Sequence, residues 1–400
     1  MAGRTRVVIL FGGRSAEHEV SILSARNVLA ALDRTLFEPV LIGIDKQGRW
    51  RAQSEKMLAG ATGDPRLLKL EDEAPTVAVA TTPSSITQLL GSDDVIFPVL
   101  HGTYGEDGTV QGLLELADVA YVGAGVLGSA IGMDKDVAKR LLRDAGIPVV
   151  DFRVVTATDL REDPRVATAH AAALGYPVFV KPANAGSSVG VSKVNDPSAL
   201  EPALRAALAF DRKVLLERGV DAREIEVAVL GNDRPAASVP GEIIVHHRDG
   251  FYSYDAKYVD ADGAAWQIPA NLPEEITARV QELAVATFRT LELSGMARVD
   301  FFVERTQPTT TSQIFVNEVN TIPGFTAISM YPRCGKRVAS PRPTSSHGSS
   351  ILRSNDVTHG AGCRRRFRSG VGRPQKRKRA NGARSQTAII RGFLRPFEKK

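Results

Sequence analysis

Apolar strands that alternate with amphipathic helices constrain the fold of this chain more than any other feature. RVVILFGG (6–13) and VIFPVLHG (95–102) each predict a buried strand that ends in glycine, and long helices are predicted at 133–150 and 273–295. Further strands are predicted at 176–182, 213–220, 224–231, 297–304 and 313–320. This alternation is typical of an α/β protein, and 400 residues with 43% hydrophobic content suffice for two or three domains.

The helix predicted at 133–150 has signals at both ends. Asp134 is a candidate N-cap, Gly146 is placed to end the helix, and Pro148 prevents its continuation. We expect three apolar side chains to lie on its buried face: Val137, Leu141 and Leu142.

The charge of the chain changes sign near Arg333. Residues 333–400 carry 14 arginines and 5 lysines against two acidic residues, a net charge of +17, whereas residues 1–332 carry −11. The stretch after residue 332 has no helical period and no apolar face. We therefore expect 333–400 to be an anomalous basic tail, disordered or read out of frame. A nucleic-acid-binding role through this tail is a rival function, but any such tail also adheres non-specifically to polyanions.

The sequence gives no sign of a membrane or secretory protein. No stretch approaches the roughly 18 to 20 apolar residues that a membrane helix needs, and the N-terminus lacks a small-residue cleavage site. Both cysteines, Cys334 and Cys363, lie near the C-terminus, so we expect no disulfide framework in the main fold. A cytoplasmic protein is expected.

The segment FVKPANAGSSVGVSKV (179–194) leaves a predicted strand through Lys181 and continues with small residues. Such residues let the backbone approach a ligand, and successive free N–H groups can hold an anion. The alternative is a tight surface hairpin with a solvated lysine.

Two predicted strands carry carboxylates in an alternating pattern. Arg298 and Asp300 are two residues apart and share one face of their strand, as do Glu318 and Asn320 on the next. If the strands pair as a hairpin, these side chains converge, and oxygen ligands of this kind suit Mg²⁺. The alternative is a solvated face of a sheet.

Gly123, Gly125 and Gly128 match the dinucleotide-binding pattern G-x-G-x-x-G. That pattern should open a helix within a βαβ unit, whereas the main helix here begins later, at Asp134. A close-packed turn between two domains is the alternative that we favour.

Seven segments in order resemble one family, the D-alanine–D-alanine ligases of the ATP-grasp superfamily. They are GGRSAEHEVSILSA (12–25), LHGTYGEDGTVQGLLE (100–115), GMDKDVAKRLL (132–142), VKPANAGSSVGVSKV (180–194), YDAKYVD (254–260), ARVDFF (297–302) and NEVNTIPGFTAIS (317–329). The resemblance runs from about Arg6 to Pro332. It implies a three-domain α/β ATP-grasp architecture with an N-terminal parallel-sheet domain at 1–132. A central subdomain at 133–224, a C-terminal subdomain at 225–332 and the tail at 333–400 would follow.

The resemblance also implies a reaction. ATP would phosphorylate the carboxylate of one D-alanine, the amine of a second would attack the acyl phosphate, and D-alanyl-D-alanine for peptidoglycan precursors would form. By motif, the ATP-binding residues would be Lys135, Lys181, Glu217, Glu224 and Lys257. Two Mg²⁺ ions, or Mn²⁺ in their place, would be held by Asp300, Glu318 and Asn320. The loop 181–190 would be a flexible flap over the triphosphate.

The family pattern assigns the remaining site residues to D-alanine. Glu17 would pair with the ammonium of the first D-alanine and His101 would place that substrate, whereas Ser329 would bind the second carboxylate. Arg298 and the N–H of Gly324 would stabilise the oxyanion of the tetrahedral intermediate. A hydrogen-bonded triad would close the site: Glu17, Ser187 and Tyr258. His101 could instead be a satisfied strand-end histidine, and Glu17 a first-turn residue that favours the helix dipole.

Tyr258 bears on the choice of the second substrate. Ligases that join D-alanine to D-lactate resemble this family but usually carry histidine at this position, so the tyrosine favours the dipeptide product over the depsipeptide. A homodimer is expected from the resemblance.

Overall fold

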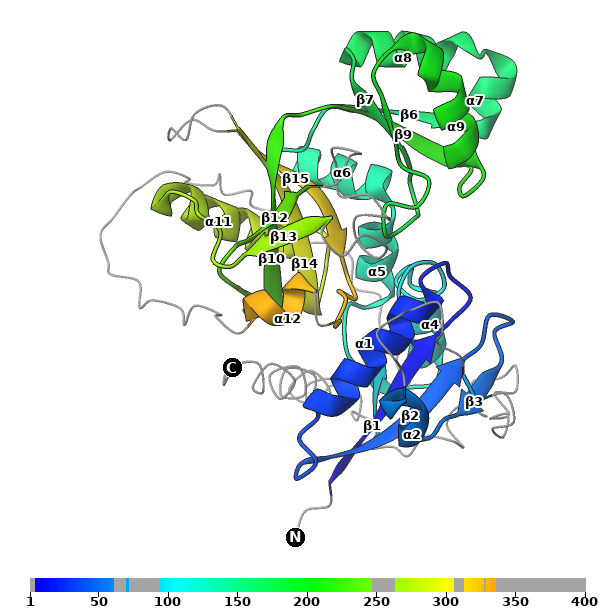
Figure 1. The fold of residues 1–400 in the computed structure, drawn as a ribbon, viewed down its shortest axis with the longest axis vertical. Helices are drawn as coiled ribbons and strands as arrows, with labels where there is room; N and C mark the ends of the chain where they lie inside the picture. The colour runs from blue at the N-terminus through cyan, green and yellow to red at the C-terminus, as the bar shows by residue number, and fades with distance from the viewer. Residues whose placement is uncertain are drawn as a thin grey trace, which may run out of the picture.

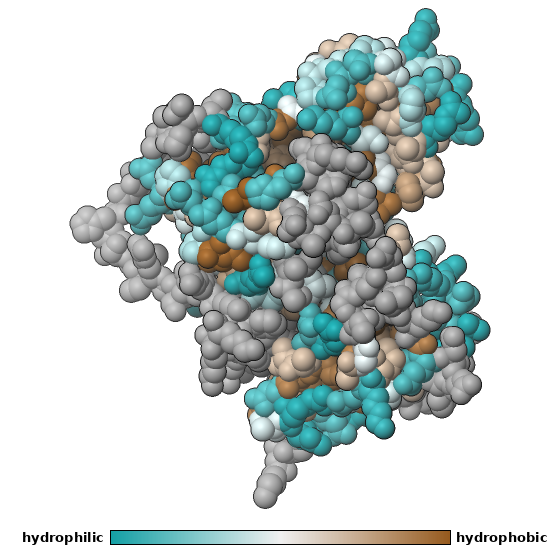
Figure 2. All heavy atoms as spheres, in the orientation of Figure 1, coloured by the Kyte–Doolittle hydropathy of each residue, from teal (hydrophilic) through white to brown (hydrophobic). Residues whose placement is uncertain are grey.

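The computed structural model describes residues 4–60, 70–71, 94–246, 263–305, 313–326 and 329–335. It contains three β-sheets with helices packed against them, and Figure 1 shows one sheet in each of three lobes. On the face drawn in Figure 2, hydrophilic residues cover much of the outer surface of the lobes, and hydrophobic residues show in smaller patches. The predicted α/β fold is confirmed.

The N-terminal sheet has the strand order β3-β2-β1-β4-β5. Its elements are β1 (Thr5–Gly12), α1 (His18–Ala31), β2 (Phe37–Ile44), β3 (Trp50–Ala52), α2 (Glu55–Ala59), β4 (Val95–Pro98), α4 (Thr109–Leu116) and β5 (Ala120–Tyr121). β1 pairs in parallel with both β2 and β4, and only the edge strand β3 runs antiparallel. Residues 7–12 of β1 are buried, which explains the unbroken apolar run that predicted this strand.

The glycines of the dinucleotide-like pattern lie where the chain leaves the N-terminal sheet. Gly125 is the N-cap of α5 (Val126–Met133), a short helix that follows β5 and precedes the helix expected to begin at Asp134. α5 leads into α6 (Lys135–Asp144) rather than to another strand of the same sheet. A Cβ on Gly128 would lie 2.6 Å from the carbonyl oxygen of Glu292. Gly128 therefore serves close packing between segments, in agreement with the alternative that we favoured, whereas a Cβ on Gly123 would meet nothing within 4 Å and one on Gly125 only the hydroxyl of Tyr121 at 3.8 Å.

The central sheet has the strand order β6-β9-β7-β8. Its elements are β6 (Phe152–Thr156), α7 (Ala157–Glu162), α8 (Arg165–Leu174), β7 (Val178–Pro182), β8 (Ser192–Val194), the 3₁₀ turn η2 (Pro197–Ala199), α9 (Leu200–Leu208) and β9 (Lys213–Arg218). The loop between β7 and β8, residues 183–191, is called the flap loop below.

The C-terminal sheet has the order β13-β12-β10-β14-β15, with β11 paired to β10. Its elements are β10 (Ala222–Gly231), β11 (Ala236–Ala237), β12 (Gly241–Val245), β13 (Ala264–Gln267), α11 (Glu274–Thr290), β14 (Gly295–Glu304), β15 (Ile314–Asn320) and α12 (Met330–Gly335). α12 extends beyond residue 332 and buries Cys334. Residues 336–400, which hold most of the expected tail, lie outside the described part of the chain.

The buried face of α6 differs from the prediction. Asp134 is the N-cap, as predicted, and its side chain accepts a hydrogen bond from the N–H of Val137 at 3.1 Å. Leu142 is buried, but Leu141 is 37% exposed. The inward face instead carries Asp136, Ala138 and Lys139, because the two charged side chains find partners of opposite sign. The hydrophobic pattern of the sequence alone could not predict which face of α6 is buried.

One hydrophobic core joins the N-terminal sheet to the C-terminal sheet. Phe97 of β4 packs edge-on against Phe325, and Phe325 packs against Tyr331 of α12. Asn27 of α1 donates a hydrogen bond to the carbonyl of Phe325 at 2.8 Å. The turn that follows β15 is therefore held by both sheets.

We expect Gly128→Ala to lower the stability of the protein, because the new methyl group would meet the backbone at Glu292. Overpacking of this kind costs about 1–3 kcal/mol. Thermal unfolding is the measurement.

Gly112→Ala is the matched control. Gly112 also lies in a helix, α4, but a Cβ there would meet nothing within 4 Å. Removing a helical glycine should then stabilise the protein by about 0.5–1 kcal/mol. Equal shifts of the two variants in the same direction would contradict the packing argument.

Candidate active site

Two adjacent pockets lie where the three sheets approach one another. The first, called the acidic pocket, is lined by residues that include Glu17, His101, Glu106, Ser187, Asn320, Gly324 and Ser329. The second, called the lysine pocket, is lined by residues that include Lys135, Lys181, Glu217, Glu224 and Asp300. Three side chains line both pockets: Glu226, Arg298 and Glu318.

The hairpin of β14 and β15 forms the boundary between the pockets. The strands are antiparallel, with Asp300 opposite Glu318 and Arg298 opposite Asn320, which confirms the predicted pairing. The ladder shifts register between Asp300 and Phe301. Four polar side chains therefore meet on one face of the sheet, and the alternative of a plain solvated face is wrong.

Arg298 lies between two carboxylates. Its Nε and Nη2 each lie 2.7 Å from an oxygen of Asp300, and its Nε lies 2.9 Å from Oε2 of Glu226. Burial lowers the pKa of Arg298, but the charges of Asp300 and Glu226 outweigh that effect and raise the pKa well above its usual value. The guanidinium is therefore a fixed, fully charged group between the pockets.

The hairpin also supplies oxygen atoms suited to a divalent cation. Asp300 and Glu318 carry carboxylates, and the side-chain amide of Asn320 lies 3.0 Å from Oδ2 of Asp300. Mg²⁺ prefers a few protein oxygens and leaves positions for water and phosphate. The described residues contain no cluster of three or more histidines, cysteines, aspartates or glutamates that could hold a metal ion. Two carboxylates and one amide could supply a few oxygen ligands, as a Mg²⁺ site requires.

The flap loop reaches across to the N-terminal sheet. The hydroxyl of Ser187 donates a short hydrogen bond to Glu17, which lies at the N-cap of α1. A Cβ on Gly186 would lie 2.4 Å from Oε2 of Glu17, so any larger residue there would require the Glu17 carboxylate to move. Ser187 and Ser188 have positive φ angles of 48° and 58°. The small residues that marked the loop in the sequence therefore allow it to pack against Glu17.

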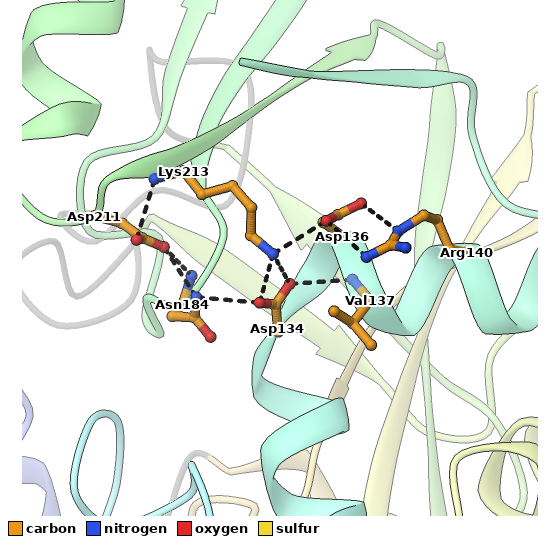
Figure 3. Close-up of polar contacts among 7 residues, drawn as sticks. All are labelled: Asp134, Asp136, Val137, Arg140, Asn184, Asp211 and Lys213. Atoms are coloured by element: carbon orange, nitrogen blue, oxygen red, sulfur yellow. Dashed lines mark hydrogen bonds and ion pairs between the residues drawn. The ribbon is translucent and has the colours of Figure 1, made fainter. Parts of the chain in front are cut away.

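A polar cluster fixes the first residues of the flap loop (Figure 3). Asp211 accepts hydrogen bonds from the backbone N–H of Asn184 at 2.8 Å and from its side-chain amide at 3.1 Å. Lys213 donates to both oxygens of Asp134, at 2.8 and 2.6 Å, and to Asp136 at 3.1 Å. The base of the loop is thereby tied to the first turn of α6.

Lys135 continues this connection towards the hairpin. Its N–H donates to the carbonyl of Ala183 at 3.0 Å, and its Nζ donates to the carbonyl of Ala185 at 2.8 Å. The same Nζ lies 3.3 Å from Oε2 of Glu318. One lysine thus links the flap loop to a candidate metal ligand.

Lys181 lies in the lysine pocket and is buried, so the alternative of a solvated surface lysine is wrong. Its Nζ pairs with Glu217 and lies 3.4 Å from Oδ1 of Asn317. The rings of Phe179 and Phe302 lie 5.7 and 5.8 Å from the same Nζ. The pocket therefore offers positive charge beside flat apolar surfaces.

His101 is held by both ring nitrogens. Nδ1 lies 3.1 Å from the carbonyl oxygen of Ile322, and Nε2 lies 3.0 Å from the hydroxyl oxygen of Ser24. Because Nδ1 must donate to the carbonyl, Nε2 accepts from Ser24, whose oxygen in turn accepts from the N–H of Phe325 at 3.2 Å. Burial lowers the pKa of His101, so the ring is neutral near pH 7.

Gly324 and Ser329 also line the acidic pocket. Ser329 donates its N–H to the carbonyl of Thr326 at 3.0 Å, and its hydroxyl accepts the N–H of Thr326 at 3.0 Å. This local turn brings the serine hydroxyl towards Gly324. Lys257 and Tyr258 lie outside the described residues.

Comparison with known proteins gives the family. The family model described as "D-ala D-ala ligase N-terminus" matches residues 6–124, and the model described as "D-ala D-ala ligase C-terminus" matches residues 141–339. The chain belongs to the D-alanine–D-alanine ligase family. It is 50% identical over 339 residues to D-alanine–D-alanine ligase A of Chromobacterium violaceum, and the match covers 83% of this chain and 90% of the relative.

Solved structures of ligases related to this family resemble the chain. The D-alanine–D-alanine ligase of Coxiella burnetii is 36% identical with a TM-score of 0.68, and the match covers 84% of this chain and 89% of that structure. VanG D-Ala:D-Ser ligase of Enterococcus faecalis is 34% identical with a TM-score of 0.69, over 83% of this chain and 94% of that structure. The expected ATP-grasp architecture is confirmed by these ligases.

Three buried charged residues of this D-alanine–D-alanine ligase family member were missed by the sequence analysis. Glu106 lies within GTYGEDG and Glu226 within REIEVAV, whereas Lys139 lies on α6 next to the Ala138–Leu142 stripe. A charged residue within an otherwise apolar stretch was an available signal for Glu226 only. Only the fold shows which partner each one meets.

Glu106 connects the N-terminal sheet to the turn after β15. Its carboxyl oxygens accept hydrogen bonds from the N–H of Gly102 at 2.7 Å and of Ile322 at 3.2 Å. Burial raises the pKa of Glu106 to about 8, and the negative charge of Glu17 adds to this rise. The folded protein therefore keeps a proton on Glu106 at neutral pH.

We expect Glu106→Gln to change the pH dependence of stability. The pKa of Glu106 is higher in the folded state than the usual 4.5, so the folded state binds more protons between about pH 4.5 and 8. The wild type should lose stability through this window, by up to about 1.4 kcal/mol per pH unit from this group. Glutamine does not titrate, so the variant lacks this loss.

Thermal unfolding of both proteins at pH 5.5 and pH 8.5 measures the difference. Glutamine cannot accept both N–H groups with oxygen, so the variant should be less stable at pH 5.5. The advantage of the wild type should shrink at pH 8.5. An advantage that stays constant between the two pH values would show that Glu106 is ionised throughout.

Proposed function

We propose that this chain joins two molecules of D-alanine to D-alanyl-D-alanine, with conversion of ATP to ADP and phosphate. The observation that carries the proposal is the pair of pockets that share Arg298, Glu226 and Glu318 in a member of the D-alanine–D-alanine ligase family. One pocket suits a nucleotide, the other suits small zwitterions, and the shared wall is the place where a phosphoryl group would pass between them.

We assign the nucleotide to the lysine pocket. Lys135 and Lys181 would neutralise its phosphates, with Lys257 at the transferred phosphoryl group. Glu217 would lie near the adenine and Glu224 near the ribose. The rings of Phe179 and Phe302 support the assignment, because they give the pocket apolar surface for a base beside its cationic group.

We assign both D-alanines to the acidic pocket. Glu17 would hold the ammonium of the first, and the neutral His101 would help to place that substrate. Ser329 would bind the carboxylate of the second. The hydrogen bond between Ser187 and Glu17 supports a role of the flap loop in closing this pocket, with Tyr258 as the third member of the triad.

The chemistry then follows from position and charge. A carboxylate oxygen of the first D-alanine attacks the γ-phosphorus of ATP, the bond to the β-phosphate oxygen breaks, and ADP leaves. The amine of the second D-alanine attacks the acyl carbon, loses a proton, and phosphate leaves. Attack by the amine gives a tetrahedral intermediate with an oxyanion, which exists until phosphate leaves. Arg298 and the N–H of Gly324 would stabilise this oxyanion.

A divalent cation would assist the nucleotide. Asp300, Glu318 and Asn320 would hold Mg²⁺, or Mn²⁺ in its place, and the ion would supply positive charge beside the phosphates. Arg298 and Lys135 already contact Asp300 and Glu318. These contacts orient the carboxylates in advance.

We further propose a homodimer in the cytoplasm. Among the described residues, no helix is both long enough and apolar enough to cross a membrane. Leu116 and Leu127 are 74% and 61% exposed, and they lie on the neighbouring helices α4 and α5. A second copy of the chain would cover them.

Purified protein is expected to release phosphate only when Mg²⁺, ATP and D-alanine are all present, and L-alanine should not replace D-alanine. The products should be separated by chromatography with D-alanine, D-serine and D-lactate in competition. We expect the D-alanyl-D-alanine dipeptide as the main product. ADP formation without any need for an amino acid, or a main product containing D-serine or D-lactate, would overturn the proposal.

We expect Asp300→Asn, Glu318→Gln and Arg298→Lys each to lower kcat by more than a hundredfold. The first two remove charge that would hold the cation, and the third replaces a planar fork by a point charge. A hundredfold loss corresponds to about 2.7 kcal/mol of barrier. Steady-state kinetics at millimolar Mg²⁺ is the measurement.

Arg223→Lys is the matched control for Arg298→Lys. Arg223 lies on β10 of the same sheet and makes a similar two-bond pair with Glu242, at 2.8 and 2.6 Å, but it lines neither pocket. Its replacement should leave kcat within about threefold of the wild type, which is under 0.7 kcal/mol. If both variants lost kcat equally, Arg298→Lys would act by disturbing the C-terminal sheet rather than the site.

A further inference from the structure

Three charged side chains form a buried group at the lysine pocket, which two of them line. Glu217 of β9 is the central member, with Lys139 of α6 on one side and Lys181 of β7 on the other. The side chains of Lys139, Glu217 and Lys181 are 2%, 1% and 10% exposed. Charges this deeply buried persist only when they are paired.

The two lysines use different oxygens of Glu217. Nζ of Lys139 lies 2.6 Å from Oε2, in an ion pair whose angle is poor for a hydrogen bond, and Nζ of Lys181 pairs with Oε1. Lys181 lines the lysine pocket, whereas Lys139 does not. The lysines therefore have the same partner but differ in their access to a ligand.

The group carries two positive charges and one negative charge. Burial raises the pKa of Glu217, but the charges of Lys139 and Lys181 outweigh burial and lower it. Burial lowers the pKa of Lys139, and the Glu217 carboxylate opposes this lowering without cancelling it. Glu217 is thus a carboxylate at neutral pH, and the Nζ of Lys139 lies 2.6 Å from it as an ion-pair partner. With both lysines protonated, the group has one positive charge in excess.

We propose that Lys139 is a positioning residue that stays with Glu217, so that Lys181 keeps a positive charge for the phosphates of the nucleotide. The inference rests on the proposed function, which gives Lys181 to ATP. Lys139 itself touches no substrate.

The reason is the cost of an unpaired buried charge. Without Lys139, Glu217 and Lys181 would form a neutral ion pair. A nucleotide phosphate could then bind Lys181 only if the carboxylate of Glu217 lost its partner and stayed as an unpaired charge in the interior. With Lys139 present, Glu217 remains neutralised when Lys181 turns towards a phosphate. Lys181 already has a second polar neighbour on the pocket side, Oδ1 of Asn317 at 3.4 Å.

The proposal predicts that the loss depends on the phosphates of the ligand. Lys139→Met leaves a group with no net charge, so we expect it to weaken binding of an ATP analogue by at least about tenfold, which is 1.4 kcal/mol. Adenosine has no phosphate that needs Lys181, so its affinity in the same variant should stay within about threefold of the wild type, under 0.7 kcal/mol. A merely structural role of Lys139 would weaken binding of both ligands alike.

Titration calorimetry with Mg²⁺ and a non-hydrolysable ATP analogue, or with adenosine, measures these affinities in the full chain. Arg140→Met is the matched control, because Arg140 neighbours Lys139 on α6, is exposed, and pairs with Asp136 instead. Arg140→Met also removes one positive charge, and the affinity of this variant for the ATP analogue should match that of the wild type. Thermal unfolding shows that each variant is folded.

Lys181→Met separates the inference from the function on which it rests. Unchanged ATP binding in Lys181→Met would overturn the role of Lys181 and the inference with it. If Lys181→Met weakens binding of the ATP analogue but Lys139→Met does not, or if Lys139→Met weakens binding of adenosine as much as that of the ATP analogue, only the inference is overturned. Should Lys139→Met fail to fold, Lys139→Gln decides by the same comparison: a loss for the ATP analogue that adenosine does not share supports the proposal, and any other result overturns it.

Discussion

The buried contact of Arg298 with Asp300 and Glu226 lies at the centre of the candidate active site. It joins two neighbouring strands, β10 and β14, on the face where both pockets open. A buried guanidinium requires carboxylates, and buried carboxylates require a cation, so none of the three can be replaced independently. The remaining groups of the site, from Lys135 on Glu318 to the flap loop on Glu17, are arranged around this contact.

The N-terminal sheet contributes a few side chains to the site. Glu17, His101 and Glu106 all lie just beyond the ends of its strands or at the start of a helix, where parallel strands present their loops. His101 and Glu106 both bond to the backbone of Ile322, so the turn after β15 depends on the position of that sheet. The proton that Glu106 keeps makes this junction sensitive to pH.

Buried charge recurs throughout the site with the same physical logic. Lys213 meets two aspartates at the base of the flap loop, and Glu217 meets two lysines at the lysine pocket. In each case a side chain or loop that lines a pocket is connected to a charged group of another element. Charge is thus supplied at the pockets without leaving an unpaired ion in the core.

Much of the fold could be predicted from the sequence, because strands and helices are specified locally. The apolar run of β1 and the cap at Asp134 depend on neighbouring residues in the chain, and both predictions are confirmed. The two-residue spacing of Arg298 and Asp300, and of Glu318 and Asn320, likewise fixed which side chains share a face. The ordered motifs then led to the ligase family, which the comparisons confirmed.

The sequence by itself determined the elements, the hairpin face and the family, since each depends on local periodicity or on motif order. Only the tertiary structure decided the partners of charges that lie far apart in the chain. Lys139 and Glu217 belong to different elements, and the face of α6 was predicted as apolar because hydrophobicity cannot register an ion pair. A charged side chain that is buried must pair with a specific group of opposite charge, whereas an exposed one is solvated by water. Which side chains are buried is decided only when the whole fold assembles.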